Sequence, residues 1–204
     1  MASELRRRLG ERLHPSPPSR ATRRSDYDLN PGMRPIKPAR LIEAGVLVPL
    51  VEREGEVAVL LTQRAEGLPD HAGQISFPGG KVHVEDASAV AAALRETEEE
   101  IGIPRDRVNI AGYLDRYETR TGFCILPVVG FVPPDLSLLL DAREVAAAFE
   151  VPLAFVMDPR RHARHARLYE GRERLFYAMP YRGYYIWGAT AGILKSMYDR
   201  LYGD

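Results

Sequence analysis

Apolar residues in one central segment recur with the spacing of an α-helix. From Asp86 onward they come three or four residues apart, which places them on one face of a helix. The residues on that face are Val90, Leu94, Thr97 and Ile101. The preceding letters, GQISFPGG, combine a short apolar run with glycines, a pattern typical of a strand that ends in a tight turn. The sequence thus predicts a strand, a turn and a helix over Gly73–Ile103.

Apolar and β-branched runs elsewhere predict strands. The segments RLIEAGVLVPLV (residues 40–51) and VAVLLTQ (residues 57–63) flank a polar turn, so we expect them to pair as a hairpin. Further strands are expected over residues 108–117, 124–132, 167–170, 175–179 and 184–187. The chain then ends in a helix over residues 189–201, whose apolar residues again follow helical spacing.

The first 40 residues differ in composition from the rest. A short helix is expected over residues 3–13, followed by a connector rich in proline and arginine. Glu4 and Glu11 argue against an organelle-targeting peptide, which is poor in acids. We therefore expect residues 1–40 to form an arm that packs on the domain or on a partner subunit of a homodimer, and residues 41–204 to form one domain.

Composition excludes several classes of protein. The 204 residues carry 28 basic and 28 acidic side chains, so no global charge favours nucleic acid. The single cysteine, Cys124, excludes an intramolecular disulfide and lies in an apolar run, which indicates a buried thiol. The basic run HARHAR (residues 162–167) lacks an acid or cysteine at ligand spacing and is expected to be a loop. With no long apolar stretch, we expect a cytoplasmic protein without membrane partners.

Acidic side chains gather on one side of the predicted helix. Glu96, Glu99 and Glu100 stand at i, i+3 and i+4, so they meet on one patch, whereas Glu98 points elsewhere. Three converging carboxylates repel one another and suit a hard divalent cation, Mg²⁺ or Mn²⁺. A merely solvated helix face is the alternative. It would not require the fixed Arg95, which we expect to orient one of the glutamates.

These residues resemble the signature of the Nudix hydrolases: Gly, five residues, Glu, seven residues, then Arg-Glu-apolar-any-Glu-Glu-any-Gly-apolar. Here it runs from Gly80 to Ile103. Asp86 stands in place of the first Glu, and eight residues separate it from Arg95. The coenzyme A pyrophosphatase branch of the family tolerates this extra residue. Residues 60–80 also resemble the second motif of that branch, although many of its members have arginine where this chain has Pro69.

The resemblance covers roughly residues 40–200 and implies a set of site residues. The implied metal ligands are the Gly79 carbonyl, Glu96, Glu99 and Glu100. The implied substrate-binding residues are Arg64, Gly73, Phe77 and Gly80. The segment EVAAAFEVPL (residues 144–153) looks like a short acidic helix found late in many Nudix proteins, which makes Glu144 and Glu150 candidate extra acids. The general base is either a glutamate of the signature, such as Glu99, or Glu144.

The resemblance further implies an α/β protein with the Nudix fold, an α/β/α sandwich built on a mixed β-sheet. The implied activity is metal-dependent hydrolysis of coenzyme A or its thioesters to 3′,5′-ADP and 4′-phosphopantetheine. Two alternatives stay open. The substrate could be another nucleoside diphosphate, such as ADP-ribose or a dinucleotide, or the domain could bind without catalysis. The intact set of three glutamates argues against the second alternative.

Overall fold

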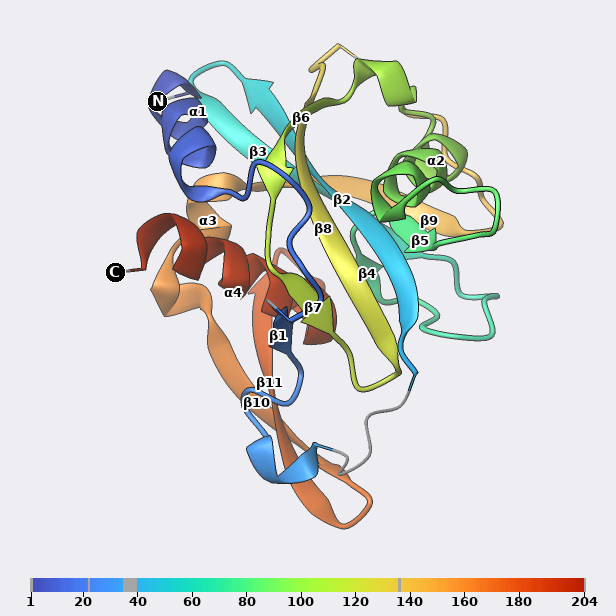
Figure 1. Ribbon diagram of the computed structural model, residues 1–204, viewed down its shortest axis with the longest axis vertical. Coiled ribbons are helices and arrows are strands. Elements are labelled where there is room, and N and C mark those ends of the chain that lie inside the picture. Colours follow the sequence, from blue (N-terminus) through green and yellow to red (C-terminus); the bar gives the residue numbers. More distant parts are fainter. Residues whose placement is uncertain (1, 22, 35–39, 136, 204) are drawn as a thin grey trace.

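The computed structural model describes residues 2–21, 23–34, 40–135 and 137–203. The chain forms a larger sheet of nine strands and a smaller sheet of three, and the elements are drawn in Figure 1. The larger sheet contains β1 (Arg23–Ser25), β2 (Ile42–Arg53), β3 (Glu56–Arg64), β4 (Ile75–Ser76), β5 (Gly79–Lys81), β6 (Asn109–Tyr113), β7 (Arg116–Glu118), β8 (Phe123–Val132) and β9 (Val145–Pro152). The smaller sheet contains β10 (Ala163–Tyr169), β11 (Arg172–Tyr181) and β12 (Tyr184–Trp187). The α-helices are α1 (Ala2–Arg12), α2 (Ala89–Ile101), α3 (Leu153–Val156) and α4 (Gly188–Tyr202), and the 3₁₀ turns are η1 (Pro31–Met33), η2 (Arg105–Arg107) and η3 (Pro159–Arg161).

The larger sheet is mixed. Its order is β1-β7-β8-β2-β3-β4, with β5 beside β2, β6 beside β8 and β9 beside β3. Strands β2 and β8 run parallel over ten residue pairs, whereas β2 and β3 form the expected antiparallel hairpin. The β10-β11-β12 sheet is antiparallel throughout. The predicted hairpin and the predicted mixed sheet are therefore confirmed.

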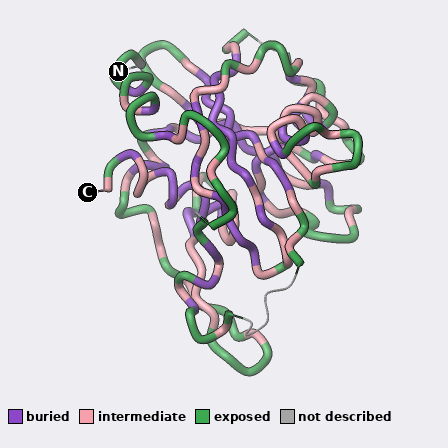
Figure 2. The backbone as a smooth tube through the Cα atoms, viewed as in Figure 1, coloured by how far each residue is buried: buried purple, intermediate pink, exposed green. Residues whose placement is uncertain are grey.

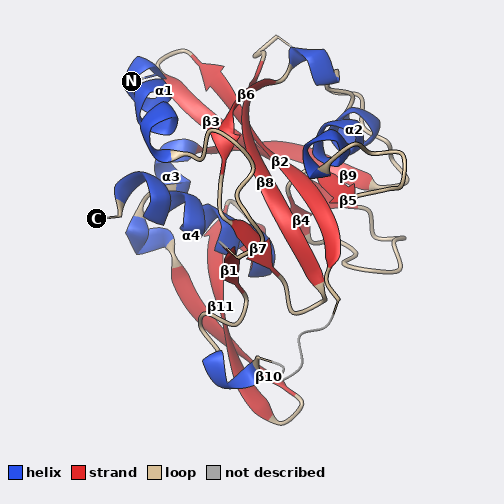
Figure 3. Cartoon of the chain, in the orientation of Figure 1, coloured by secondary structure: helices blue, strands red, loops and turns tan. Residues whose placement is uncertain are grey.

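Helices cover both faces of the larger sheet (Figure 3). Helix α2 packs against β2, β5 and β8, while α1, α3 and α4 lie on the opposite side. Each face has its own buried cluster, and the purple segments of Figure 2 follow the central strands. The α2 side buries Leu47, Leu60, Ile101 and Leu126, and the other side buries Val48, Leu61, Met179 and Leu194. The α/β/α arrangement expected from the sequence is confirmed, and Cys124 is buried as expected.

The N-terminal arm packs on the domain itself. Helix α1 inserts Leu5, Leu9 and Leu13 into the cluster that contains α4. Strand β1 then pairs in parallel with β7. The Asp26 carboxylate accepts hydrogen bonds from the Tyr117 hydroxyl of β7 and from Arg174 of β11, 3.0 Å each, so it links the two sheets. The last prolines of the expected connector, Pro35 and Pro38, lie outside the described residues.

Two local predictions are wrong. The expected acidic helix over residues 144–153 is instead strand β9, which pairs antiparallel with β3 from Ala58–Pro152 to Gln63–Ala147. The helix propensity of its alanines is outweighed by pairing with a strand distant in sequence. The expected basic loop over residues 162–167 largely forms β10, which pairs with β11 along its whole length. In addition, the strand predicted over residues 108–117 is divided between β6 and β7.

No helix within the described ranges is long and apolar enough to cross a membrane.

Gly45 in β2 lies directly against the first residue of α2. A Cβ atom at this position would lie 1.8 Å from the Ala89 carbonyl oxygen, which is backbone and cannot rotate away. We expect Gly45→Ala to lower the free energy of unfolding by about 3 kcal/mol, as overpacking of a tight site does, measured by urea denaturation. Gly10→Ala is the matched control, because nothing lies within 4 Å of its Cβ position in α1. An unchanged midpoint for Gly45→Ala would contradict this helix–sheet contact.

Candidate active site

Helix α2 is defined at both ends by its own sequence. The Ser88 hydroxyl caps the first turn by accepting the Ala91 N–H at 3.2 Å. Gly102 ends the helix in the left-handed conformation, with φ of 73°, and its N–H donates to the Glu98 carbonyl. The intervening helix turns its apolar face toward β2 and β8. The helix therefore holds its acidic residues at fixed positions, with Glu100 against β5 and Glu98 turned toward Arg105.

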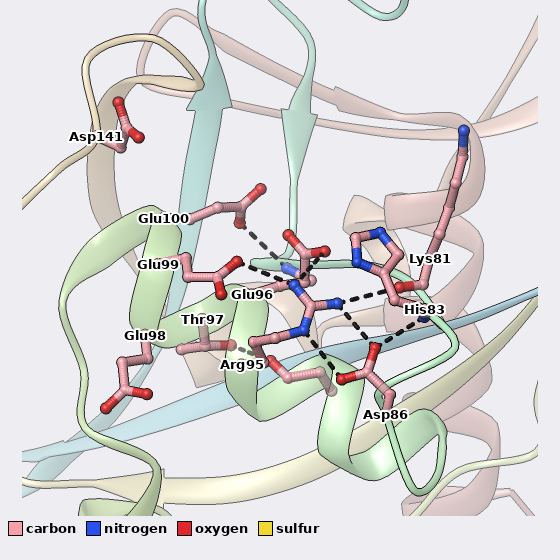
Figure 4. A network of polar contacts seen from close by, with 12 residues as sticks. Lys81, His83, Asp86, Arg95, Glu96, Thr97, Glu98, Glu99, Glu100 and Asp141 are labelled. Carbon is pink, nitrogen blue, oxygen red and sulfur yellow. Dashed lines mark hydrogen bonds and ion pairs between the residues drawn. The ribbon is translucent and has the colours of Figure 1, made fainter.

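Arg95 is the centre of the polar network on α2 (Figure 4). Its guanidinium makes two hydrogen bonds to Asp86, both 2.9 Å, one to Glu96 at 3.0 Å and one to Glu99 at 2.9 Å. This hydrogen-bonded pairing lowers the pKa of Asp86 to about 2. Asp86, the departure from the family signature, thus anchors the arginine. Arg95 in turn fixes the Glu96 side chain, because a planar guanidinium holds several carboxylates in set directions.

Three carboxylates converge beside this network. Glu96 and Glu100 from α2 and Glu144 from the turn before β9 each offer an oxygen atom, and these atoms all lie within 4.8 Å of one another. Strand pairing brings Glu144 there, since its carbonyl accepts the N–H of Ala65 at the end of β3, 2.8 Å away. We call Glu96, Glu100 and Glu144 the acidic triad.

The acidic triad contains a carboxylate that is costly to ionise without a cation. Glu100 is only 4 % exposed and accepts one hydrogen bond, from the Gly79 N–H at 3.1 Å. Burial first, and then the nearby charges of Glu96 and Glu144, raise its pKa to about 8 despite that bond. An all-oxygen donor set with excess negative charge fits a hard divalent cation such as Mg²⁺ or Mn²⁺. The acidic triad therefore has the ligand type and the charge that a hard divalent cation requires.

Glycine is required at two positions below the acidic triad. A Cβ atom on Gly80 would lie 2.6 Å from the Glu96 carboxylate. Gly79 has φ of 143°, and a Cβ there would lie 2.4 Å from the Gly45 carbonyl oxygen. The glycine pair lets the chain pass directly under the carboxylates, so the Gly79 amide can reach Glu100.

The other residues singled out from the sequence take different positions. Glu99 lies outside the acidic triad among the described residues; its side chain is 55 % exposed and bonds to Arg95. Arg64, at the end of β3, has a buried Nε without a hydrogen-bond partner in the described chain, and its charge favours the ionised form of Glu100. Phe77 is buried in the core cluster beside α4. Glu150 pairs with Arg53, away from the acidic triad.

A cleft near the same end of β3 was not predicted from the sequence. It has a volume of ≈360 Å³ and lies between residues 63–75 and the β11–β12 turn. Gly73, expected at the substrate site, lines it together with Tyr184, Tyr185 and Trp187. The aromatic residues of β12 were the one feature of the sequence that could have indicated this cleft. Nothing in the local sequence, however, indicates which segment those rings face.

Comparisons with known proteins identify the family and the fold. The family model of the NUDIX domain matches residues 41–171. The Nudix hydrolase NudL of Cronobacter sakazakii is 44 % identical over 155 residues, covering 76 % of this chain and 80 % of the relative. NudL of Escherichia coli strain K12 is 43 % identical with the same coverage. A MutT/nudix family protein from Enterococcus faecalis matches in structure with a TM-score of 0.50 and 16 % identity, covering 83 % of this chain and 65 % of that one, which supports the fold alone.

Proposed function

This chain belongs to the Nudix family, and we propose that it hydrolyses the diphosphate bond of coenzyme A or its thioesters, giving 3′,5′-ADP and 4′-phosphopantetheine or its acyl derivative. Nudix hydrolases act on nucleoside diphosphate derivatives, so the reaction class follows from the family. The observation that carries the proposal is the acidic triad, held within 4.8 Å beside a fixed arginine. Such a group of carboxylates serves metal-assisted phosphoryl chemistry.

A Mg²⁺ or Mn²⁺ ion bound by these acids would neutralise phosphate oxygens and lower the pKa of a water molecule. Glu96, Glu100 and Glu144 are the proposed ligands, and the Gly79 carbonyl and Glu99 remain candidate ligands from the family pattern. Arg95 keeps Glu96 in position through their 3.0 Å hydrogen bond.

The proposed reaction is the hydrolysis of one P–O bond of the diphosphate by a water molecule. The oxygen of a water molecule forms a bond to one phosphorus, and the bond between that phosphorus and the bridging oxygen breaks. The proton of the water passes to a carboxylate, with Glu99 on the solvent side of Arg95 and Glu144 in the acidic triad as the two candidates. Arg64 is the candidate arginine for the substrate from the motif over residues 60–80, and its positive charge also acts on Glu100.

The substrate assignment rests on the motif over residues 60–80, whose glycine, Gly73, lines the cleft beside the site. The second candidate is a Nudix hydrolase of another nucleoside diphosphate, such as ADP-ribose or a dinucleotide. Pro69 favours it, because many coenzyme A pyrophosphatases have arginine there. A non-catalytic binding module is disfavoured by the complete set of acids.

A substrate panel tests the proposal. Coenzyme A, dephospho-coenzyme A, ADP-ribose, NADH and diadenosine polyphosphates are incubated with Mg²⁺ and then with Mn²⁺, and the products are identified by mass. We expect coenzyme A to give two phosphorylated products, with little turnover of dephospho-coenzyme A if the enzyme recognises the 3′-phosphate. Faster turnover of ADP-ribose or a dinucleotide would replace the assignment with the second candidate.

A further inference from the structure

The cleft lies between the two sheets, at the same end of β3 that Glu144 of the acidic triad contacts. Gln63 of β3 and Ile75 of β4 line one side, and Tyr184, Tyr185 and Trp187 of β12 line the other. Its volume of ≈360 Å³ is within the range of small-ligand sites, about 300–1,000 Å³. A cleft of this size between two sheets can hold one part of a substrate.

The cleft and the acidic triad share the end of β3. Gln63 lines the cleft, whereas the next residue, Arg64, influences Glu100 through its charge. The Arg64 N–H donates to the Gln74 carbonyl at 2.9 Å, and Gln74 also lines the cleft. Consecutive strand residues point to opposite faces, so the cleft and the acidic triad flank this end of β3. A ligand that reaches around the strand end would place its diphosphate at the acids and an adjoining group in the cleft.

Aromatic rings on one side of the cleft are held in place by their neighbours. Tyr184 stacks on Phe149 with ring centroids 3.6 Å apart. Trp187 packs edge-on against Phe176, and the Tyr185 hydroxyl is 2.7 Å from Nδ1 of His165. Tyr185 is nevertheless 41 % exposed. Exposed aromatic rings that are fixed in advance favour stacking with a flat heterocycle, because little side-chain entropy is lost on binding.

The polar groups of the cleft are unsuited to phosphate. Of the described lining residues, Glu66 alone carries a charge, and it is negative. Its carboxylate lies against Gly73, where a Cβ would be only 2.6 Å away. Gln63 and Gln74 add amide donors and acceptors. This combination repels an anion and suits a neutral ring that carries N–H donors and nitrogen acceptors.

We propose that this cleft binds the purine base of the nucleoside diphosphate substrate, stacked on the β12 aromatic rings with its polar edge toward Glu66 and the glutamines. The assignment rests on the proposed function only in that the same ligand carries its diphosphate to the acidic triad. Binding of the base itself requires neither metal nor hydrolysis.

Trp187 provides a direct measurement, because it is the single tryptophan of the chain. AMP has the base but no diphosphate bond, so it reports on the cleft without turnover. We expect AMP, titrated without metal, to change Trp187 fluorescence saturably. The loss of signal caused by the absorbance of AMP itself is measured with free tryptophan and subtracted. Tyr185→Ala should weaken AMP binding about tenfold, as loss of one stacking ring does. It should raise the KM for coenzyme A similarly while kcat stays nearly constant.

Two further variants distinguish the loss of ring stacking from a general loss of folded structure. Tyr185→Phe keeps the ring and removes only the hydroxyl bonded to His165, so it should weaken AMP binding much less than Tyr185→Ala does. Tyr202→Ala is the matched control: its ring is 43 % exposed, compared with 41 % for Tyr185, but it lies at the far end of α4 and does not line the cleft. It should leave AMP binding and KM unchanged.

The outcomes distinguish this inference from the proposed function. Hydrolysis of coenzyme A without any AMP-dependent change at Trp187 would overturn the base site and leave the function standing. Saturable quenching by 4′-phosphopantetheine in place of AMP would also overturn it, because the cleft would then take the other half of the substrate. Saturable AMP binding that Tyr185→Ala weakens, in a protein that hydrolyses no diphosphate, would support the cleft assignment and reject the function.

Discussion

Replacing Glu100 by glutamine is expected to lower kcat roughly 10³-fold, because a lost metal carboxylate removes several kcal/mol of transition-state stabilisation and each ~1.4 kcal/mol is tenfold. Glu100 is the buried member of the acidic triad. Glutamine keeps its shape and can still accept the Gly79 N–H at 3.1 Å, so the fold should be preserved. Steady-state kinetics with coenzyme A and Mn²⁺, together with circular dichroism, measure both effects.

Glu98→Gln is the matched control for this variant. Glu98 stands on the same helix but points away from the site (Figure 4), and it pairs with Arg105. The same change of charge there should leave kcat within about twofold of the parent, as surface substitutions usually do. Mn²⁺ should raise the Tm of the parent and of Glu98→Gln by similar amounts. The rise should be much smaller for Glu100→Gln, which has lost a metal ligand. Full activity of Glu100→Gln would show that the acidic triad is not the metal site.

Replacing Arg95 by lysine is expected to reduce both activity and metal affinity by about 10- to 100-fold, the usual effect of losing a residue that orients a ligand. Arg95 holds Asp86, Glu96 and Glu99 at once through a planar guanidinium. Lysine retains the positive charge but cannot make these bonds together. Glu96 then loses its fixed direction. Mn²⁺ affinity, measured by electron paramagnetic resonance, reports this positioning independently of turnover.

Arg105→Lys is the control for charge and chain length, since Arg105 pairs with Glu98 on the solvent side. It should bind Mn²⁺ like the parent. If Arg95→Lys lowered kcat but bound Mn²⁺ normally, Arg95 would act on the substrate instead of on Glu96. If both kcat and the Mn²⁺ affinity of Arg95→Lys were normal, Arg95 would have no role in the site.

Part of the candidate site could be predicted from local spacing. Glu96 and Glu100 are four residues apart on a helix, so their approach follows from helical geometry alone. The same geometry placed Glu99 with them, but side-chain partners decide where a carboxylate points, and Glu99 bonds to Arg95. The outward direction of Glu98 was predicted correctly.

Contacts between segments distant in sequence determine the features that could not be predicted from the sequence. Glu144 reaches the other acids because β9 pairs with β3, whereas its alanine-rich surroundings favoured a helix. The cleft joins residues near Gly73 to the aromatic residues of β12, two segments far apart in the chain. The leucines of α1 indicated an apolar face, but only the assembled core shows that the domain itself covers it.

Asp26 adds polar links between two sheets that also share a buried core. Through Tyr117 and Arg174 it joins the two sheets that border the proposed base site, and Asn30 adds two bonds to the Leu175 backbone of β11. The spacing between those sheets thus depends on a stretch that touches neither substrate nor metal. Truncated versions prepared for crystallisation or ligand screening should keep residues 23–30, since a library tested without them would sample a differently shaped binding site.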